Sequence, residues 1–311
     1  MRYVFIVNPV AGKKNAYDTV FSPIREYLEA NGIEFSCYVT ERPKHATELA
    51  ETESGKGDAV RIYAIGGDGT LSETAAGAIG RKNAEVGIFP CGSGNDYVKT
   101  FGDSTNFLSL KKQLKAHSRP VDMIHSNGQY SINLCSVGLD ARVAFEMVKF
   151  KDIPFISGPM AYNLALAKVL IGKLGERLEI LIDGGKRFDG TYLFALAGSG
   201  KYYGGGFCGA PQAVPDDGLL DFVLIQKPPL YQIPPLIKIY KNGEHLKSKK
   251  FKKLLTFCRG KRMEITAPNL AVANFDGECA VIRSLRFEVV PNAVNFYCPG
   301  LKIQKIHNNC K

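Results

Sequence analysis

Residues 59–79 read AVRIYAIGGDGTLSETAAGAI and join three local patterns. Residues 59–65 form a short apolar run rich in β-forming side chains, which predicts a buried strand. After a glycine cluster at residues 66–70, apolar residues recur at helical spacing at Leu71, Ala75, Ala78 and Ile79. A strand, a tight glycine turn and a helix in this order predict one unit of a parallel sheet with crossover helices.

The first third of the chain repeats this alternation. Strand-like runs are expected at residues 3–7, 34–39, 59–65 and 85–89. Between the first two runs, helical spacing is found at Val20, Ile24, Tyr27 and Leu28. We therefore predict an open α/β domain, and such sheets bind their ligands beyond the carboxyl ends of the strands.

From about Val121 the pattern changes to β runs punctuated by glycine. These runs lie at residues 130–137, 178–182, 191–197, 219–225, 263–266 and 285–290. Residues 140–150 and 159–170 have helical spacing and are expected to be insertions. The predicted fold class is therefore α/β plus all-β, in two domains. An N-terminal open α/β domain takes residues 1–120 and is completed by residues 296–311, and a C-terminal antiparallel β-sandwich-like domain takes residues 121–295.

The composition of this 311-residue chain is that of a globular protein. Its 45% hydrophobic and 23% charged residues argue against disorder. The eight cysteines form no CxxC pair or tight framework, so we expect reduced thiols rather than zinc ligands or disulfides. The first residues lack the pattern of a signal peptide, and no run approaches the ~18 apolar residues of a membrane span. These features predict a cytoplasmic protein that meets a membrane only transiently, from outside.

A formal net charge of +10 favours anionic partners. The densest basic segment, residues 238–253, follows a stretch that prolines break at residues 228–235, and it contains seven lysines together with Leu246 and Phe251. This segment is either a solvated basic face or a surface that contacts anionic lipid, where each lysine contributes about 1 kcal/mol. Because aromatic residues are few among these lysines and recognition signatures are lacking, no nucleic-acid partner is expected.

Three glycine-rich turns each follow a predicted strand: NPVAGK at residues 8–13, GGDGT at 66–70 and GSGND at 92–96. Glycine lets backbone N–H groups converge on a phosphate, and a following helix adds its positive end. One such turn would be ordinary loop chemistry, but three at one edge of a parallel sheet predict a nucleotide site. GxxxxGK[ST] is absent, and no GxGxxG opens the first helix, which disfavours an ordinary Walker or dinucleotide fold.

Asp68 is unexpected inside a phosphate cradle, because its carboxylate would repel the ligand. One reading is that it meets a metal ion or hydrogen-bonds to loop amides or ribose. The other is that it merely caps the helix that begins near Thr70.

The ordered set of NPVAG at residues 8–12, GGDGTLSE at 66–73, PCGSGND at 90–96 and DGE at 276–278 resembles the diacylglycerol kinase catalytic-domain family. The resemblance covers nearly the whole chain, and the short length is similar to the bacterial soluble lipid kinases of this family. These include diacylglycerol kinases and YegS-like lipid kinases, and they are related to sphingosine kinases. GGDGT alone is shared with NAD kinases, so only the ordered set is specific. The resemblance implies ATP and Mg²⁺ as cofactors and a lipid alcohol as substrate.

The resemblance also implies which residues hold the nucleotide: Asn8, Pro9, Val10, Ala11, Gly12, Thr40, Gly66, Gly67, Asp68, Gly69, Thr70, Leu71, Ser72 and Ser93. Ser72 stands where asparagine is frequent in the family, and Ser93 where threonine is frequent. Both keep a hydrogen-bonding side chain, so nucleotide binding is still expected. Thr40 ends a predicted strand and is either a ligand contact or a surface threonine.

Residues 210–221, APQAVPDDGLLD, resemble a second acidic motif of the family. The resemblance implies a Mg²⁺ ion held by the Asp217 carboxylate and the carbonyl oxygens of Val214 and Leu219. Mixed carboxylate and backbone oxygens suit a hard cation. Taken without the resemblance, Asp-Asp-Gly before a strand is ordinary turn chemistry.

The resemblance implies catalytic roles for Glu278, Asp68 and Asp122. Glu278 matches the family's general base, which a lipid alcohol needs because it is a poor nucleophile near neutral pH. Taken alone, Asp276-Gly277-Glu278 is more often a hairpin turn. Asp122 matches an acidic position that links metal, water and nucleotide in related enzymes, or it is a surface aspartate that opens a strand.

Together these features predict an ATP-dependent lipid kinase that transfers the γ-phosphate to a lipid hydroxyl, with diacylglycerol as first-choice acceptor and phosphatidic acid as product. NAD kinase-like phosphotransfer is one alternative. A catalytically silent, nucleotide-responsive protein that docks on anionic membranes is another. The sequence does not choose among diacylglycerol, phosphatidylglycerol, a sphingoid base and a polyprenol, and it leaves a homodimer open.

Overall fold

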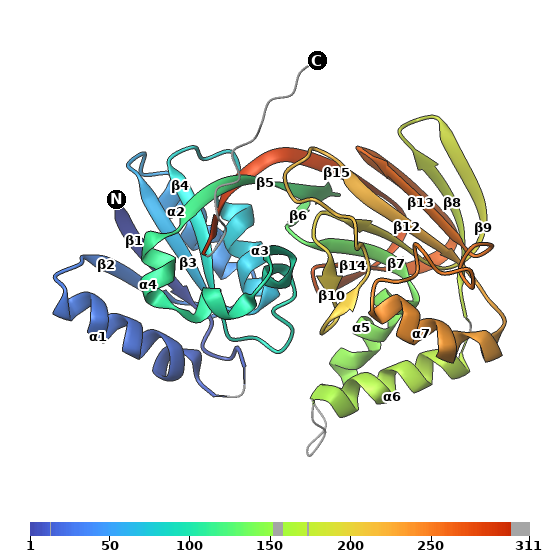
Figure 1. Cartoon of the computed structure of the whole chain (residues 1–311), viewed down its shortest axis with the longest axis horizontal. Helices are drawn as coiled ribbons and strands as arrows, with labels where there is room; N and C mark the ends of the chain where they lie inside the picture. Colours follow the sequence, from blue (N-terminus) through green and yellow to red (C-terminus); the bar gives the residue numbers. More distant parts are fainter. Residues whose placement is uncertain (13, 152–157, 173, 300–311) are drawn as a thin grey trace.

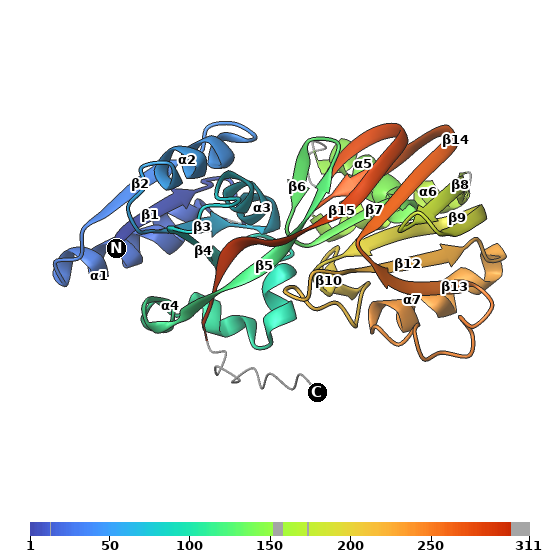
Figure 2. The same ribbon diagram turned by 90° about the horizontal axis from the view of Figure 1, so that it is seen from above.

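The computed structural model describes residues 1–12, 14–151, 158–172 and 174–299. Figure 1 shows two domains side by side, the N-terminal one in blue to teal and the C-terminal one in green to red. Seen from above in Figure 2, β5 (His117–Ser126) and β15 (Glu278–Cys298) cross from one domain to the other. This arrangement confirms the predicted fold class of an α/β domain followed by a β-sandwich-like domain.

The N-terminal domain is built on four parallel strands in the order β2-β1-β3-β4. These are β1 (Arg2–Val7), β2 (Phe35–Val39), β3 (Val60–Gly66) and β4 (Ala84–Pro90). The helices are α1 (Ser22–Ala30), α2 (His45–Ser54), α3 (Asp68–Gly77) and α4 (Leu110–Lys115), with short helical segments η1 (Tyr17–Phe21), η2 (Tyr97–Phe101) and η3 (Ser104–Leu108).

Helices cover both faces of this sheet because its central strands are apolar on both faces. Val4 and Ile6 pack with α2 and α3, whereas Phe5 and Val7 face α1, where they meet Leu28. All four strand residues are fully buried. Such continuous apolar strands are expected of a parallel sheet that helices cover on both faces.

The C-terminal domain is mostly antiparallel β-structure around one apolar core. Its strands β7, β8, β9, β12, β14 and β15 all contribute to that core. The remaining elements are β5, β6 (Gln129–Ser131), β7 (Leu134–Gly138), β8 (Glu176–Ile182), β9 (Lys186–Gly198), β10 (Tyr202–Tyr203), β11 (Phe207–Cys208), β12 (Leu220–Gln226), β13 (Leu255–Gly260) and β14 (Arg262–Phe275). The helices are α5 (Leu139–Lys151), α6 (Gly158–Ile171) and α7 (Ile233–Lys241), with the short helical segment η4 (Leu230–Gln232). Helix α7 packs on the other face of β9 and β12.

Strand β15 belongs to both domains. It runs antiparallel to β14 from the hairpin at Glu278 onward, and near its end Asn295 and Phe296 pair in parallel with β4. The end of the described chain therefore extends the sheet of the first domain. The predicted domain limits at residues 120 and 296 stay a prediction, and residues 300–311 lie outside the described residues.

Two local expectations need correction. The run predicted at residues 130–137 is split into β6 and β7, because the amides of residues 132–134 bind a carboxylate instead of continuing the ladder. The proline-containing stretch at residues 228–235 does not break a helix but starts one. Helix α7 carries proline in its first turn, where a missing N–H costs no helical hydrogen bond. Among the described helices, none is long and apolar enough to span a membrane.

Candidate active site

The three glycine turns lie together at the carboxyl edge of the parallel sheet. The Asn8 amide donates to the Ile65 carbonyl at 2.9 Å, which ties the first turn to the end of β3. The Cys91 amide donates to the Gly66 carbonyl at 2.8 Å, which ties the third turn to the second. All three turns therefore lie at one edge of the sheet, as their local strand and turn signals predicted. Lys13, within the first turn, lies outside the described residues.

Glycine is required where these turns touch, because their backbones approach too closely for a side chain. A Cβ atom on Gly92 would lie 2.5 Å from the Gly67 Cα, and one on Gly12 would lie 2.4 Å from the Cys91 carbonyl oxygen. Gly69 differs, since a Cβ atom there would meet no heavy atom within 4 Å. The turns therefore pack tightly against each other but leave open space in front of Gly69.

Helix α3 begins in the second turn and points its positive end at this rim. Asn8 links the first two turns, because its Nδ2 donates to the Thr70 Oγ1 at 3.2 Å. Thr40, directly after β2, donates its amide to the Val7 carbonyl at 2.8 Å and so lies at the same edge. Clustered backbone amides beside a helix N-terminus suit an anionic ligand such as a phosphate.

The Asp68 carboxylate points away from this space and into the third turn. One of its oxygens accepts hydrogen bonds from the Asp96 and Tyr97 amides at 2.8 and 3.0 Å, and the Asp96 amide also lies 3.0 Å from the other oxygen. Burial raises the pKa of Asp68, and the two amides partly offset that rise. Of the readings left open by the sequence, the geometry fits a carboxylate that hydrogen-bonds to loop amides. Asp68 thus fixes the shape of the cradle.

The third constellation is the hairpin between β14 and β15. Asp276 and Gly277 have φ angles of 49° and 102°, as expected for a two-residue hairpin loop with Asp-Gly at its centre. Glu278 follows as the exposed first residue of β15. The hairpin reading of this motif is confirmed, and the functional reading stays a prediction that the turn allows, since it exposes Glu278.

Asp276 joins the hairpin to helix α3 of the N-terminal domain. Its Oδ2 accepts a hydrogen bond from the Ser72 Oγ of α3 at 2.8 Å. It also accepts the amides of Ile132 and Asn133, while Oδ1 accepts the amide of Leu134 at 2.8 Å. Burial raises the pKa of Asp276 to about 6, although these hydrogen bonds oppose the rise. The sequence did not predict these contacts of Asp276. The only available signal was that Asp276 lies inside the DGE motif.

Asp68 and Glu278 consequently belong to two segments that contact each other, α3 and the β14–β15 hairpin. Asp68 and Ser72 lie one turn apart on α3, and the partner of Ser72 precedes Glu278 by two residues. The charge of Glu278 also adds to the rise in the pKa of Glu73 that burial causes, so these two carboxylates are close. The Ser72–Asp276 hydrogen bond therefore places the hairpin that carries Glu278 against α3, the helix that begins at Asp68, rather than on the opposite side of the molecule.

Asp122 is engaged by the backbone of the second acidic motif and of β15. Its Oδ2 accepts the Gly218 amide at 2.7 Å, its Oδ1 accepts the Asn292 amide at 2.8 Å, and its own amide donates to the Pro215 carbonyl at 2.6 Å. Asp122 is 1% exposed, so it is not a surface aspartate. Its carboxylate fixes the turn that contains Asp217.

The predicted metal ligands Val214, Asp217 and Leu219 lie on this turn, but the carboxylate among them is already in use. Asp217 Oδ2 binds the Arg259 guanidinium, and Asp217 Oδ1 accepts the Leu219 amide at 3.1 Å. The part of the chain that the structure describes also contains no group of three or more His, Cys, Asp or Glu side chains that could hold a metal ion. These residues do not fit a preformed cation site, and we derive no step through an ion held there.

Comparison with known proteins decides the family. Residues 2–126 match the model of the diacylglycerol kinase catalytic domain, and residues 133–298 match that of the YegS C-terminal NAD kinase β-sandwich-like domain. The chain belongs to this family of lipid kinases. Its family membership confirms the resemblance seen in the ordered motifs, and a kinase of this family uses ATP.

Individual relatives are similar to this chain along most of its length. A "Probable lipid kinase YegS-like" of Shewanella frigidimarina is 30% identical over 258 residues, which cover 80% of this chain and 79% of the relative. A diacylglycerol kinase of Staphylococcus carnosus is 27% identical over 296 residues, 94% of either chain. A crystal structure of a diacylglycerol kinase from Bacillus anthracis superposes with a TM-score of 0.67 at 20% identity, covering 97% of this chain and 98% of that chain. The last likeness shows the fold.

Proposed function

We propose that this lipid kinase transfers the γ-phosphate of MgATP to the hydroxyl of diacylglycerol and forms phosphatidic acid, with Glu278 as general base. The observation that carries the proposal is the hydrogen bond between Ser72 and Asp276. It holds the hairpin that presents Glu278 against the helix whose N-terminus opens the phosphate cradle. An acceptor hydroxyl at this junction would have a base on one side and the γ-phosphate on the other.

The reaction needs alignment and charge neutralisation more than covalent help from the protein. The acceptor oxygen attacks the γ-phosphorus, the bond from that phosphorus to the β,γ-bridging oxygen breaks, and ADP leaves. Glu278 takes the proton that the acceptor hydroxyl loses. The Mg²⁺ ion that arrives with ATP neutralises charge on the phosphate oxygens. Backbone amides of the three turns hold those oxygens, while Asp68 and Asp122 keep their loops in shape.

Gly69→Ala tests the cradle without disturbing the fold. Because a Cβ atom at residue 69 meets no protein atom, this variant is expected to keep or slightly raise its Tm. The same methyl group projects into the space proposed for the phosphates, so MgATP affinity is expected to fall at least ~10-fold, which is about 1.4 kcal/mol. Calorimetric titration of MgATP and thermal unfolding measure the two effects. Unchanged affinity in the Gly69→Ala protein would place the phosphates elsewhere.

The acceptor side is expected along α5 and α6. Helix α5 begins beside Glu278, since the Cys279 Sγ donates to the Ala141 carbonyl at 3.6 Å. Helix α5 packs on α6 through Val143, Ala165 and Val169. Exposed apolar side chains are found on α6 at Met160, Leu164 and Ile171. Exposed apolar side chains on the helix that packs against α5 would suit the acyl chains of a lipid acceptor.

The function is tested by incubating the purified protein with MgATP and diacylglycerol in mixed micelles and measuring phosphatidic acid. A parallel arm offers phosphatidylglycerol, a sphingoid base and a polyprenol, so that the arms separate the choice of lipid from the reaction class. Product from another lipid alone would replace diacylglycerol as the acceptor. No phosphorylated lipid in any arm, with MgATP bound, would favour the catalytically silent alternative.

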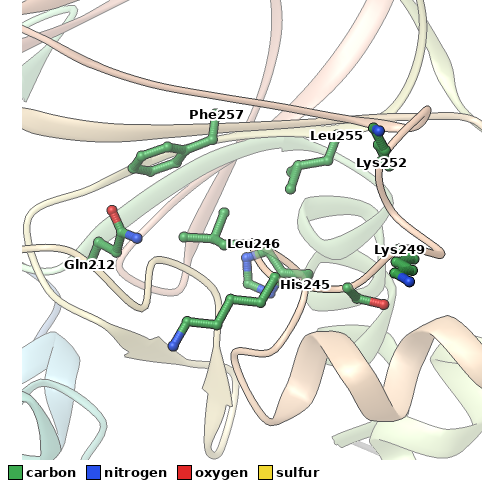
Figure 3. A pocket seen from close by; sticks show the side chains of 9 residues that line it. Gln212, His245, Leu246, Lys249, Lys252, Leu255 and Phe257 are labelled. Carbon is green, nitrogen blue, oxygen red and sulfur yellow. The ribbon is translucent and has the colours of Figure 1, made fainter.

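We propose further that the lysine-rich segment docks on anionic membranes. A pocket of about 420 Å³ is lined by Gln212, residues 245–249, Lys252, Leu255 and Phe257. Figure 3 shows Leu246 beside Gln212 and below the β13 side chains Leu255 and Phe257. Ammonium groups around an apolar floor suit a phospholipid headgroup, because a free phosphate would leave that floor unused. The peripheral membrane contact expected from charge would then have a defined site.

Lys247→Gln, Lys249→Gln and Lys252→Gln combined are expected to weaken binding to phosphatidylglycerol vesicles on the order of 100-fold. The matched control replaces the exposed Lys82, Lys111 and Lys186 with glutamine and removes the same charge elsewhere. Vesicle co-sedimentation is the measurement, with pure phosphatidylcholine vesicles as a second control. An equal loss in both triple variants would show that only net charge matters.

A further inference from the structure

Arg259 lies between two carboxylates of the second acidic motif. On β13 it is the direct cross-strand partner of Asp221 on β12. Its Nε donates to Asp221 Oδ1 at 2.9 Å, and its Nη2 binds Asp217 Oδ2. One guanidinium thus joins the start of β12 to the turn that precedes it. The resemblance to the lipid kinases implies a divalent cation on this same turn.

Asp221 shows why a positive charge is needed at this point. It is 1% exposed, and a buried carboxylate is costly unless a cation or hydrogen bonds compensate it. The second oxygen of Asp221 has no hydrogen-bond partner among the described residues. Arg259 is therefore the cation that balances Asp221.

The rest of the turn is also tied down by the protein itself. Asp216 pairs with Arg119 at 3.3 Å, Gly218 donates its amide to Asp122, and Leu219 donates its amide to Asp217. All three acidic side chains of residues 216–221 therefore have an arginine partner. A divalent ion bound by Asp217 would lie close to the Arg259 guanidinium, and two such positive charges repel each other strongly at short range.

We infer that Arg259 supplies to residues 214–221 the positive charge that a bound divalent cation would supply, so that this segment keeps its shape without an ion of its own. The divalent ion required by the kinase is then only the one that accompanies ATP. The Mn²⁺-binding and stability tests of this inference use the protein without nucleotide or lipid. Failure of the inference is therefore distinguishable from failure of the proposed lipid kinase activity.

The wild-type protein gives the first test. The full chain is treated with EDTA, dialysed, and studied without nucleotide. Electron paramagnetic resonance of free Mn²⁺ is expected to show no binding at micromolar concentrations, and millimolar Mg²⁺ is expected to leave Tm unchanged. Stoichiometric Mn²⁺ binding, or a clear rise of Tm with Mg²⁺, would overturn the inference. This arm requires no variant to fold.

Arg259→Met gives the second test, because it removes the charge and leaves both aspartates. We expect its Tm to fall and Mn²⁺ binding to appear, with Mg²⁺ restoring part of the lost Tm. Adding Asp217→Asn to Arg259→Met is expected to abolish the new Mn²⁺ binding. A folded Arg259→Met protein that binds no Mn²⁺ would show that this turn is no cation site at all, which would also overturn the inference.

Arg177→Met is the matched control. Arg177 forms an ion pair with Asp189 at 2.6 Å in the same domain, but both side chains are more than half exposed. Exposed pairs contribute little to stability, so this variant is expected to keep its Tm and to bind no Mn²⁺. In turnover, the wild-type rate is expected to follow the concentration of MgATP, with no further rise when Mg²⁺ exceeds ATP. A second rise with excess Mg²⁺ that Asp217→Asn abolishes would contradict the assignment.

Discussion

Glu278→Gln is expected to lower kcat by ~10²- to 10⁴-fold while the affinity for MgATP stays unchanged. Glutamine has nearly the shape of glutamate, but its amide cannot take the proton of the acceptor hydroxyl. Glu278 is exposed at the start of β15, so the substitution should also leave Tm unchanged. Phosphate transfer to lipid micelles measures kcat, and calorimetric titration measures nucleotide affinity.

Glu73→Gln is the matched control for Glu278→Gln. Glu73 is the carboxylate that Glu278 influences electrostatically, but it is half-buried and accepts the Ala46 amide at 3.3 Å. The Glu73→Gln enzyme is therefore expected to keep most of the wild-type kcat. An active Glu278→Gln enzyme would remove Glu278 from the role of base, and loss of turnover in Glu73→Gln alone would transfer that role to Glu73.

The nucleotide-binding side was predictable from sequence because its signals are local. One continuous stretch contains the strand at residues 59–65, the glycine cluster that follows it and the helical spacing through Ile79. The structure has β3 and α3 in this stretch. The close approach of Gly67 and Gly92 was not predictable in this way, because it depends on two turns that are distant in sequence. The motif marked both glycines but could not show that their backbones touch.

The C-terminal domain was predictable at the level of its strands but not of its irregular parts. The run at residues 130–137 has the alternation of one strand, and only the distant Asp276 carboxylate explains why the backbone turns aside there. Likewise, Pro234 and Pro235 signal a break when read locally. In the fold they lie in the first turn of α7, where proline is well tolerated.

The candidate site was also predictable only where its features depend on local sequence. The Asp-Gly pair before Glu278 predicted a hairpin from local turn chemistry. No local pattern, however, links Arg259 to Asp217, which lies 42 positions earlier in the sequence. The register between β12 and β13 brings the two together, and that register is a property of the folded sheet. The resemblance implied a metal ion at this turn, and the contact with Arg259 on which our proposal for the turn depends could not be read from the sequence.

The second large effect is expected for Asp276→Asn. Asp276 accepts four hydrogen bonds, three from backbone amides and one from Ser72. An asparagine keeps one carbonyl oxygen, but its NH₂ group must face other donors at the second position. Because hydrogen bonds to a charged acceptor contribute about 1.5–3 kcal/mol each, we expect a lower Tm and a loss of kcat of about 100-fold.

Ser72→Ala tests the contact between the domains without disturbing the fold of the hairpin. It removes only the hydrogen bond from α3 and leaves the three amides on Asp276, so Tm should change little and kcat should fall about 10-fold. The affinity for MgATP should be retained, because the Ser72 hydroxyl is bound to Asp276 rather than directed into the cradle. Steady-state kinetics that separate kcat from the KM for ATP measure this difference. A raised KM with unchanged kcat would instead assign Ser72 to the nucleotide, as the resemblance implied, and would show that Glu278 reaches its position without this contact.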